Sequence, residues 1–290
     1  MVVFVYVWMR PSARCIRKNG NVHRILAGIL VCTAIGVMGA REWWLSPRNF
    51  ALDVLDVGQG TAALLTGPGR MQVLVDGGPD ASVLEQLPRV MPFLDRRIEL
   101  VVLSHPDSDH LTGLVSILER YSVDALLLTG ASHDLPRYAA LMDLAAARRI
   151  PLLRSSSVRS IHVGGITLDI LWPPRNGAVR PGNNGSIVLK VFGGGRSVLL
   201  PGDIEEDSEQ LLVRLKEKAL KTDVLVVPHH GSRTSSSTGL LLAVRPALAV
   251  LPVGRTNRYG HPHADVVARY RAFGIELRST AIEGNVHIPL

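Results

Sequence analysis

Four side chains able to bind a metal ion lie within six residues in the middle of the chain. They are His105, Asp107, Asp109 and His110. An apolar run ending at Leu103 precedes them and a helical spacing of leucines follows, which predicts a strand, a loop and a helix. Such a strand end can direct imidazole and carboxylate groups to one point, as a divalent cation requires. We therefore favour a metal site over a polar turn that only caps the helix.

Later loops add three groups of candidate residues, and each follows an apolar run. Asp203 stands at the predicted start of a helix, where aspartate often serves as an N-cap, and we favour a bridging metal carboxylate instead. The tandem pair His229–His230 follows the predicted strand 224–227, where a single structural histidine would be common. His261 lies just before another predicted helix, so it could reach the site, cap that helix or face solvent.

The composition suits one large or two small domains with a substantial core, because 47% of the 290 residues are apolar. The formal net charge of +7 favours an anionic partner, either nucleic acid or lipid headgroups. Aromatic residues make up 5% of the chain, which argues against an extended base-stacking platform. The two cysteines, Cys15 and Cys32, give neither a disulfide framework nor a cysteine metal site.

Residues 1–47 differ from the rest of the chain. A basic segment ending at Arg24 precedes an uncharged apolar stretch over residues 25–40. This stretch is shorter than the ~20 residues that span a bilayer, but flanking arginines and the Trp43–Trp44 pair could extend it. We predict a membrane anchor that leaves the following domain outside the cytoplasm. The alternatives are a signal peptide whose cleavage would release the protein, and a buried helix.

Residues 48–290 indicate one compact domain in which strands alternate with helices. A hairpin is expected across Gly67–Gly69, and helices are expected over residues 81–94, 137–149 and 205–220. Because the strands are flanked by helices on both outer faces, the sequence predicts an α/β fold, an αββα sandwich.

The pattern at residues 105–110 resembles the His-x-His-x-Asp-His signature of the metallo-β-lactamase superfamily, with Asp107 in place of the second histidine. An ordered set of motifs is also similar to the C-terminal hydrolase-like domain of the ComEC family of competence DNA-uptake proteins. Besides residues 105–110, the set comprises Leu55-Asp-Val-Gly-Gln-Gly60, Val75-Asp-Gly-Gly78, Asn183-Asn-Gly-Ser186, Leu200-Pro-Gly-Asp203, Pro228-His-His-Gly-Ser232 and Tyr259-Gly-His-Pro-His263. Single motifs are weak, and their order along residues 48–290 makes the resemblance specific.

The resemblance implies a metallo-β-lactamase-like site that holds two divalent metal ions. The expected ligands are His105, Asp107, Asp109, His110, Asp203 and His230. The family has one histidine where this chain has His229–His230, so His230 is the expected ligand and His229 would face substrate. Asn184 occupies an interval where many members place another histidine, so it could join His105, Asp107 and Asp203 at the first metal position. Mn²⁺ or Zn²⁺ is expected and Mg²⁺ is a further option, because oxygen donors harden the site.

The implied function is metal-dependent hydrolysis of DNA phosphodiesters in connection with competence. Asp109 would orient and deprotonate water, His229 or His261 would assist the leaving oxygen, and substrate contacts would come from Asn184, Ser232 and Ser235. The implied partners are DNA, the membrane and a competence channel protein. The alternatives are a small-molecule hydrolase of the lactonase or thioesterase type, or a non-catalytic DNA-binding accessory of an uptake channel.

Two departures from the family pattern bear on this hypothesis. The family usually has an aspartate after the Gly58–Gly60 turn, where this chain has Thr61. If that aspartate takes part in the chemistry, Thr61 would impair activity. The channel-forming helices of the full family protein are absent from these 290 residues, so a stand-alone relative or a part of a split channel gene is expected.

Overall fold

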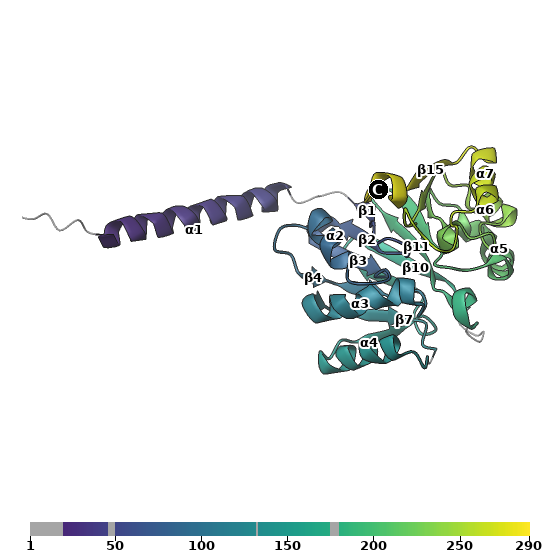
Figure 1. The fold of residues 1–290 in the computed structure, drawn as a ribbon, viewed down its shortest axis with the longest axis horizontal. Coiled ribbons are helices and arrows are strands. Elements are labelled where there is room, and N and C mark those ends of the chain that lie inside the picture. The colour runs from purple at the N-terminus through teal and green to yellow at the C-terminus, as the bar shows by residue number, and fades with distance from the viewer. Residues whose placement is uncertain (1–19, 46–49, 132, 175–179) are drawn as a thin grey trace, which may run out of the picture. The chain divides into compact units, whose positions relative to one another are not determined.

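The computed structural model describes residues 20–45, 50–131, 133–174 and 180–290 (Figure 1). Contacts divide the chain into two units, Met1–Leu45 and Ser46–Leu290. The first contains helix α1, Gly20–Leu45. Among the described residues, no helix has both the length and the apolar character needed to cross a membrane. The predicted anchor over residues 25–40 is therefore not confirmed, and residues 1–19 of the basic segment lie outside the described part.

Two seven-stranded sheets form the centre of the second unit. The first sheet has the order β16 (Val286–Pro289), β1 (Ala51–Val54), β2 (Ala63–Gly67), β3 (Met71–Val75), β5 (Leu100–Val102), β7 (Leu126–Leu128) and β8 (Leu152–Arg154). The second has the order β15 (Glu276–Ser279), β14 (Leu248–Leu251), β13 (Val224–Val226), β12 (Arg196–Leu200), β11 (Val188–Gly193), β10 (Ile166–Trp172) and β9 (Ser160–Val163). A short pair, β4 (Arg97–Ile98) and β6 (Ser122–Val123), forms a separate two-stranded sheet.

Helices cover the outer face of each sheet (Figure 1). The first sheet shares a buried apolar cluster with α2 (Val83–Val90), α3 (Ser108–Arg120) and α4 (Pro136–Ala147). The second sheet shares another with α5 (Glu206–Leu220), α6 (Thr238–Val244) and α7 (Ala264–Ala272). A third cluster fills the space between the sheets. Helix α8 (Thr280–Glu283) and the 3₁₀ turns Pro68–Arg70, Gly182–Gly185 and Pro228–Gly231 complete the described elements. The predicted αββα sandwich is confirmed.

Strand β5 shows why the layers form. Leu100 and Val102 belong to the cluster between the sheets, and Val101 belongs to the cluster beneath the first helical layer. Both faces of this strand are therefore buried, which explains an uninterrupted apolar run rather than an alternating one. Its parallel pairing with β3 and β7 places the carboxyl ends of these strands at one edge of the sheet. The candidate metal ligands follow the carboxyl ends of such parallel strands in the chain.

Candidate metal centre

Parallel strands of both sheets deliver the candidate ligands to one place. In the first sheet, the chain leaves β3 at Asp76 and leaves β5 just before His105. In the second sheet, β12 and β13 also run parallel, and they lead to Asp203 and His230 respectively. The carboxyl ends of parallel strands supply the site, as is usual in α/β folds. Helix α3 then begins at Ser108 and carries two more ligand-type residues in its first turn.

Three histidines direct ring nitrogens without hydrogen-bond partners into the centre. Each ring is fixed through Nδ1, with His105 on Ser104 Oγ at 3.0 Å, His110 on Asp76 Oδ2 at 2.8 Å and His230 on the Pro252 carbonyl at 2.9 Å. Ser104 Oγ donates its hydrogen to Asp76, so it accepts a hydrogen bond from His105 Nδ1. With Nδ1 as the donor in every case, the Nε2 lone pairs are free for a metal ion. All three Nε2 atoms are buried and have no hydrogen-bond partner.

Asp203 lies at the middle of these nitrogens. Its Oδ1 is 3.2 Å from His110 Nε2, and its Oδ2 is 3.4 Å from His230 Nε2 and 4.0 Å from His105 Nε2. Asp109 Oδ2 also approaches His230 Nε2, at 3.3 Å. The ligand atoms of Asp109, His110, Asp203 and His230 all lie within 4.8 Å of one another. We call these four residues the ligand cluster.

His105 and Asp107 form a second group beside the ligand cluster. Their Nε2 and Oδ2 atoms lie 3.8 Å apart, and His105 also faces Asp203. Asp203 is therefore shared between two sets of ligand-type atoms, as a bridging carboxylate would be. The side chain of Asp107 is 47% exposed, whereas that of Asp203 is 5% exposed. The structure thus brings all six predicted ligands together.

Burial and neighbouring carboxylates set the charges of the centre. Burial lowers the pKa of His105, and His110 beside it lowers that pKa further. Burial also disfavours the charged form of His230, but Asp203 and Asp109 outweigh it and raise its pKa to about 9. Burial disfavours ionised Asp109, yet His230, whose Nε2 lies 3.3 Å from Asp109 Oδ2, and the charge of His110 lower its pKa to about 2. Asp109 and Asp203, whose pKa values are both lowered, are ionised at neutral pH and require a positive charge beside them.

A divalent cation fits this chemistry. Unprotonated Nε2 atoms and ionised carboxylates are the donors that Zn²⁺ and Mn²⁺ accept, and carboxylates alone suit Mg²⁺. Without a cation, protons on His110 and His230 balance the buried charge of Asp203. A metal ion would take their place, which makes the ligand cluster a candidate metal-binding site.

The loop that carries His230 has an unusual backbone. His229 and His230 both adopt left-handed conformations, with φ of 50° and 52°, and Gly231 follows with φ of 78°. Non-glycine residues seldom adopt this region, and such strain is concentrated at functional sites. The sharp reversal points the two rings in different directions, with their centroids 6.4 Å apart. His230 reaches the ligand cluster, while His229 does not.

His229 instead lies within a polar network at the rim. Its Nε2 is 3.3 Å from Asn183 Nδ2, and its Nδ1 is 3.3 Å from Thr234 Oγ1. Glu205 accepts a hydrogen bond from Thr234 and lies 3.7 Å from His229 Nδ1. The predicted substrate-facing position of His229 is compatible with this location, because 18% of its side chain is exposed. Asn183 was not among the predicted site residues.

Three predicted substrate-binding residues have other partners. Asn184 bonds Glu205 twice, through the Glu205 carboxylate and the Glu205 backbone amide. Ser232 is buried and lies 3.0 Å from Thr234 Oγ1. Ser235 is buried and donates to the Pro228 and Ser232 carbonyls. These contacts give the side chains a role in holding their loops, and they offer no support for the predicted contacts with substrate.

His261 lies next to His229, with ring centroids 5.7 Å apart. Its Nδ1 is buried and has no hydrogen-bond partner. Burial and the neighbouring histidines His229, His230 and His263 lower its pKa to about 4, so the ring is neutral at pH 7. His261 is therefore brought to the rim of the site and not into the ligand cluster. Its predicted part in proton transfer stays a prediction.

The turn before β2 contacts the site through its backbone. Thr61 N donates to the Asp109 carbonyl at 3.1 Å. A Cβ on Gly60 would lie 2.3 Å from the same oxygen, and Gly60 has φ of 150°, so glycine is required there. Position 61 therefore borders the start of α3. Thr61, which stands where the family usually has an aspartate, thus lies beside Asp109.

Sequence reasoning missed Asp76, which orients a ligand. Besides holding His110, this buried carboxylate accepts from the Ser104 amide and hydroxyl, both at 2.7 Å. Carboxylates that fix the tautomer of a ligating histidine are a common feature of metal sites. The signal was the motif Val75-Asp-Gly-Gly78, which served only as part of the family resemblance. The positive φ of Asp76, 61°, places its side chain against α3.

Asp76→Asn should weaken metal binding about 10- to 100-fold. An amide nitrogen facing His110 Nδ1 favours the tautomer with its proton on Nε2, which removes the ligand lone pair. Competition with a chelating indicator measures the affinity. Asp53→Asn is the matched control, because Asp53 holds His287 Nδ1 at 2.8 Å outside the ligand cluster. Equal affinities in the two variants would contradict the assignment.

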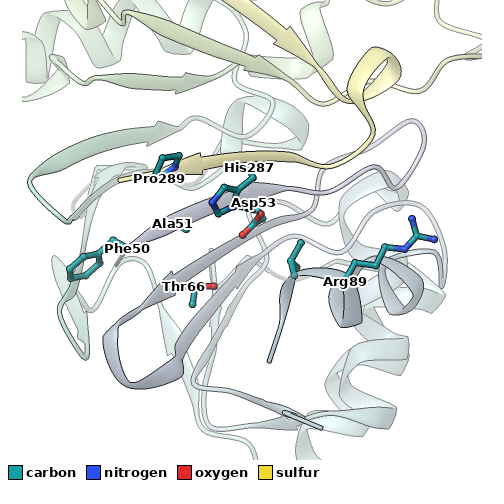
Figure 2. Close-up of a pocket in the computed structure, with 8 residues that line it drawn as sticks. Phe50, Ala51, Asp53, Thr66, Arg89, His287 and Pro289 are labelled. Carbon is teal, nitrogen blue, oxygen red and sulfur yellow. Dashed lines mark hydrogen bonds and ion pairs between the residues drawn. The ribbon is translucent and has the colours of Figure 1, made fainter. Parts of the chain in front are cut away.

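A pocket of about 430 Å³ on the face formed by β1, β2 and β16 contains none of the predicted ligands (Figure 2). Asp53 and His287 are cross-strand partners there, and Figure 2 shows their side chains pointing toward one another. Burial raises the pKa of Asp53, although His287 counteracts it. Arg89 and Phe50 border the same pocket. Asp53 is thus a carboxylate that holds a histidine away from the metal centre, which suits it as the control for Asp76→Asn.

Known proteins show the same fold and related sequences. Recombination protein 2 of Haemophilus influenzae is 34% identical over 92% of this chain, and Competence protein ComA of Neisseria gonorrhoeae is 31% identical over 88%. The chain spans about a third of these relatives, 32% and 34% of their respective lengths. The metallo-beta-lactamase fold protein YhfI of Bacillus subtilis superimposes with a TM-score of 0.55 at 13% identity, covering 82% of this chain and 99% of YhfI.

The predicted resemblance to ComEC-type competence proteins is confirmed by these relatives. Residues 55–255 match the family described as the metallo-beta-lactamase superfamily. This match includes every predicted metal ligand from His105 to His230. Two helix-covered sheets with the ligand cluster at their strand ends, together with this match, show that the chain belongs to the metallo-β-lactamase superfamily.

Proposed function

We propose that this protein is a metal-dependent phosphodiesterase that cleaves DNA in connection with competence DNA uptake. The ligand cluster carries the hydrolase part of the proposal, because it combines free imidazole nitrogens with ionised carboxylates. The relatives named for recombination and competence supply the DNA part. Since the chain spans about a third of their lengths, their whole activity is not transferred to it.

The residues of the centre divide the work of hydrolysis. His105, Asp107, Asp109, His110, Asp203 and His230 would hold up to two divalent ions. When bound, these ions would act as Lewis acids toward the phosphoryl oxygens and activate water. Asp109 is partly exposed and ionised, so it can orient that water and accept its proton. His229 and His261 lie at the rim, where their ring N–H groups can hydrogen-bond a leaving oxygen.

The experiment incubates the purified chain with labelled single- and double-stranded DNA in Mn²⁺, Zn²⁺ or Mg²⁺. We expect cleavage that needs the metal and weakens steeply with added salt, because phosphate contacts release counterions. Asp109→Ala should reduce it by roughly 10²- to 10⁴-fold. Asp53→Asn should leave it unchanged. If the metal-loaded protein leaves DNA intact and hydrolyses a lactone or thioester, it is a small-molecule hydrolase instead.

We also propose that the N-terminal segment holds the domain at the outer face of a membrane. The support is the charge asymmetry of the sequence, in which five arginines and lysines between residues 10 and 24 precede the apolar residues 25–40. A reporter fused after Leu290 should be active only outside the cytoplasm. Cytoplasmic activity alone would refute this orientation, and release of a shortened soluble protein would favour signal cleavage.

A further inference from the structure

The loop between β14 and α7 presents an arginine whose charge is not neutralised. Arg258 is exposed, and its Nη2 donates to the Tyr259 hydroxyl at 3.0 Å. The guanidinium carbon lies 5.1 Å from the centroid of the Tyr259 ring, as in a cation–π contact. Among the described residues, no carboxylate forms an ion pair with Arg258. The guanidinium is thus held in place while its charge remains available.

A row of rings connects Arg258 with the metal centre. The rings of Tyr259 and His261 are stacked, with centroids 5.8 Å apart and an interplanar angle of 24°. His261 in turn contacts His229, which borders His230. The hydrogen bond that Arg258 donates to Tyr259 is the main cause that raises the pKa of the guanidinium, and the charge of Asp109 adds to it. Arg258 therefore lies at the rim of the site, on the side of His261.

The loop that carries Arg258 is braced on two sides. Asn257 donates through Nδ2 to the carbonyls of Gly254 and His261, at 3.2 and 2.7 Å, and accepts from the His261 amide at 3.0 Å. Gly254 packs against the turn before β2, where a Cβ would lie 2.9 Å from Gln59 N. That same turn bonds the start of α3 through Thr61. These contacts fix the base of the loop against the elements that carry Asp109.

We infer that Arg258 binds a phosphate oxygen of the substrate at the rim of the metal centre, and that Tyr259 positions its guanidinium. This inference rests on the proposed function. A phosphodiester that enters a site of ionised aspartates needs positive charge on the side that the metal ions do not cover. A guanidinium presents paired donors that match phosphate oxygens, and charge-assisted bonds of this kind are about twice as strong as neutral ones. The residue would favour phosphodiesters over neutral esters.

The test compares Arg258→Gln with Arg214→Gln, an equal charge loss at an exposed position of α5. With DNA and Mn²⁺, we expect kcat/KM to fall about 100-fold or more in Arg258→Gln and less than about twofold in the control. Binding is measured by anisotropy of a labelled oligonucleotide in Ca²⁺, with a gel to verify that it stays intact. The slope of log Kd against log salt should decrease by about 1 in Arg258→Gln alone.

Two further variants separate charge from position. Arg258→Lys should restore the salt slope but only part of kcat/KM, because an ammonium keeps the charge without the paired donors. Tyr259→Phe keeps the ring and removes the hydroxyl that holds Nη2, so it should lower kcat/KM less than Arg258→Gln and leave the salt slope unchanged. A Tyr259→Phe protein with unaltered kcat/KM would remove the positioning role.

The outcomes distinguish this inference from the proposed function. If the unmodified protein cleaves DNA and Arg258→Gln matches it in kcat/KM and salt slope, the phosphate role of Arg258 is wrong and the nuclease assignment stands. If the unmodified protein neither binds nor cleaves DNA, the proposed function fails and this inference fails with it. A loss shared equally with Arg214→Gln would show a general charge effect and would also overturn the assignment.

Discussion

Replacing Asp203 by alanine should release at least one metal ion and reduce DNA cleavage on the order of 10³-fold or more. The reason is its position, since its two oxygens face His110, His230 and His105 within 4.0 Å. Without this carboxylate, three buried imidazoles face one another, and Asp109 beside His230 is the one anion left in the ligand cluster. Metal content per chain, measured by elemental analysis after gel filtration, provides the direct readout.

The Asp203→Ala result has to be separated from loss of the fold. Circular dichroism should show the secondary structure of the unmodified protein, because Asp203 belongs to the ligand cluster and to none of the apolar clusters. Asp107→Ala is the graded comparison, because its side chain is 47% exposed and lies beside a single histidine, His105. We expect a smaller loss of metal there. Full metal content in folded Asp203→Ala would exclude the bridging role.

The ligand cluster could be predicted because its residues follow apolar strands. Val101, Leu199 and Leu225 mark buried strands, and parallel pairing brings their carboxyl ends to one edge of each sheet. The types and order of the residues after those strands then indicated a metal site. The choice of His230 over His229 came from the family resemblance, and the left-handed backbone explains it physically. The same apolar strands therefore predict both the sandwich and the edge at which the site residues meet.

Other features depend on pairings that the sequence does not display. Asp76 and His110 are 34 positions apart, and only the register of β3 against β5 brings them to 2.8 Å. Asn184 and Ser232 have residue types that suit substrate binding, yet nearby backbone and side-chain partners occupy them. Polar residues in tight loops often bond locally, and a linear pattern does not separate the two uses.

Helix α2 shows how one residue can shift a boundary. The sequence predicted a helix over residues 81–94, and the structure has Val83–Val90. Met91 precedes Pro92, and its ψ of 153° is extended, because the proline ring disfavours a helical conformation of the residue before it. This local rule places the end of the helix before Pro92. The prediction of the metal site does not depend on this boundary, because α2 carries none of the predicted ligands.

Gly113→Ala should destabilise the protein by about 3 kcal/mol, the upper end of what overpacking costs. Gly113 lies in α3, where its amide donates to the Gly78 carbonyl at 3.1 Å. A Cβ at this position would lie 1.9 Å from the Gly77 carbonyl oxygen and 2.7 Å from that of Asp80. These are backbone atoms of the turn that follows Asp76, so no side-chain rotation relieves the clash.

The same substitution should also weaken metal binding, because α3 carries Asp109 and His110 and would have to move away from Asp76. Alanine is ordinarily the better helix former by up to ~1 kcal/mol, so helix propensity alone predicts the opposite sign for stability. Gly239→Ala in α6 tests that term, since a Cβ there meets only Ser237 Oγ at 3.9 Å, and it should leave stability unchanged or raise it. Denaturant midpoints measure both variants. If Gly113→Ala unfolds at the same midpoint as Gly239→Ala, the close packing of α3 on the Asp76 turn does not hold His110 in place.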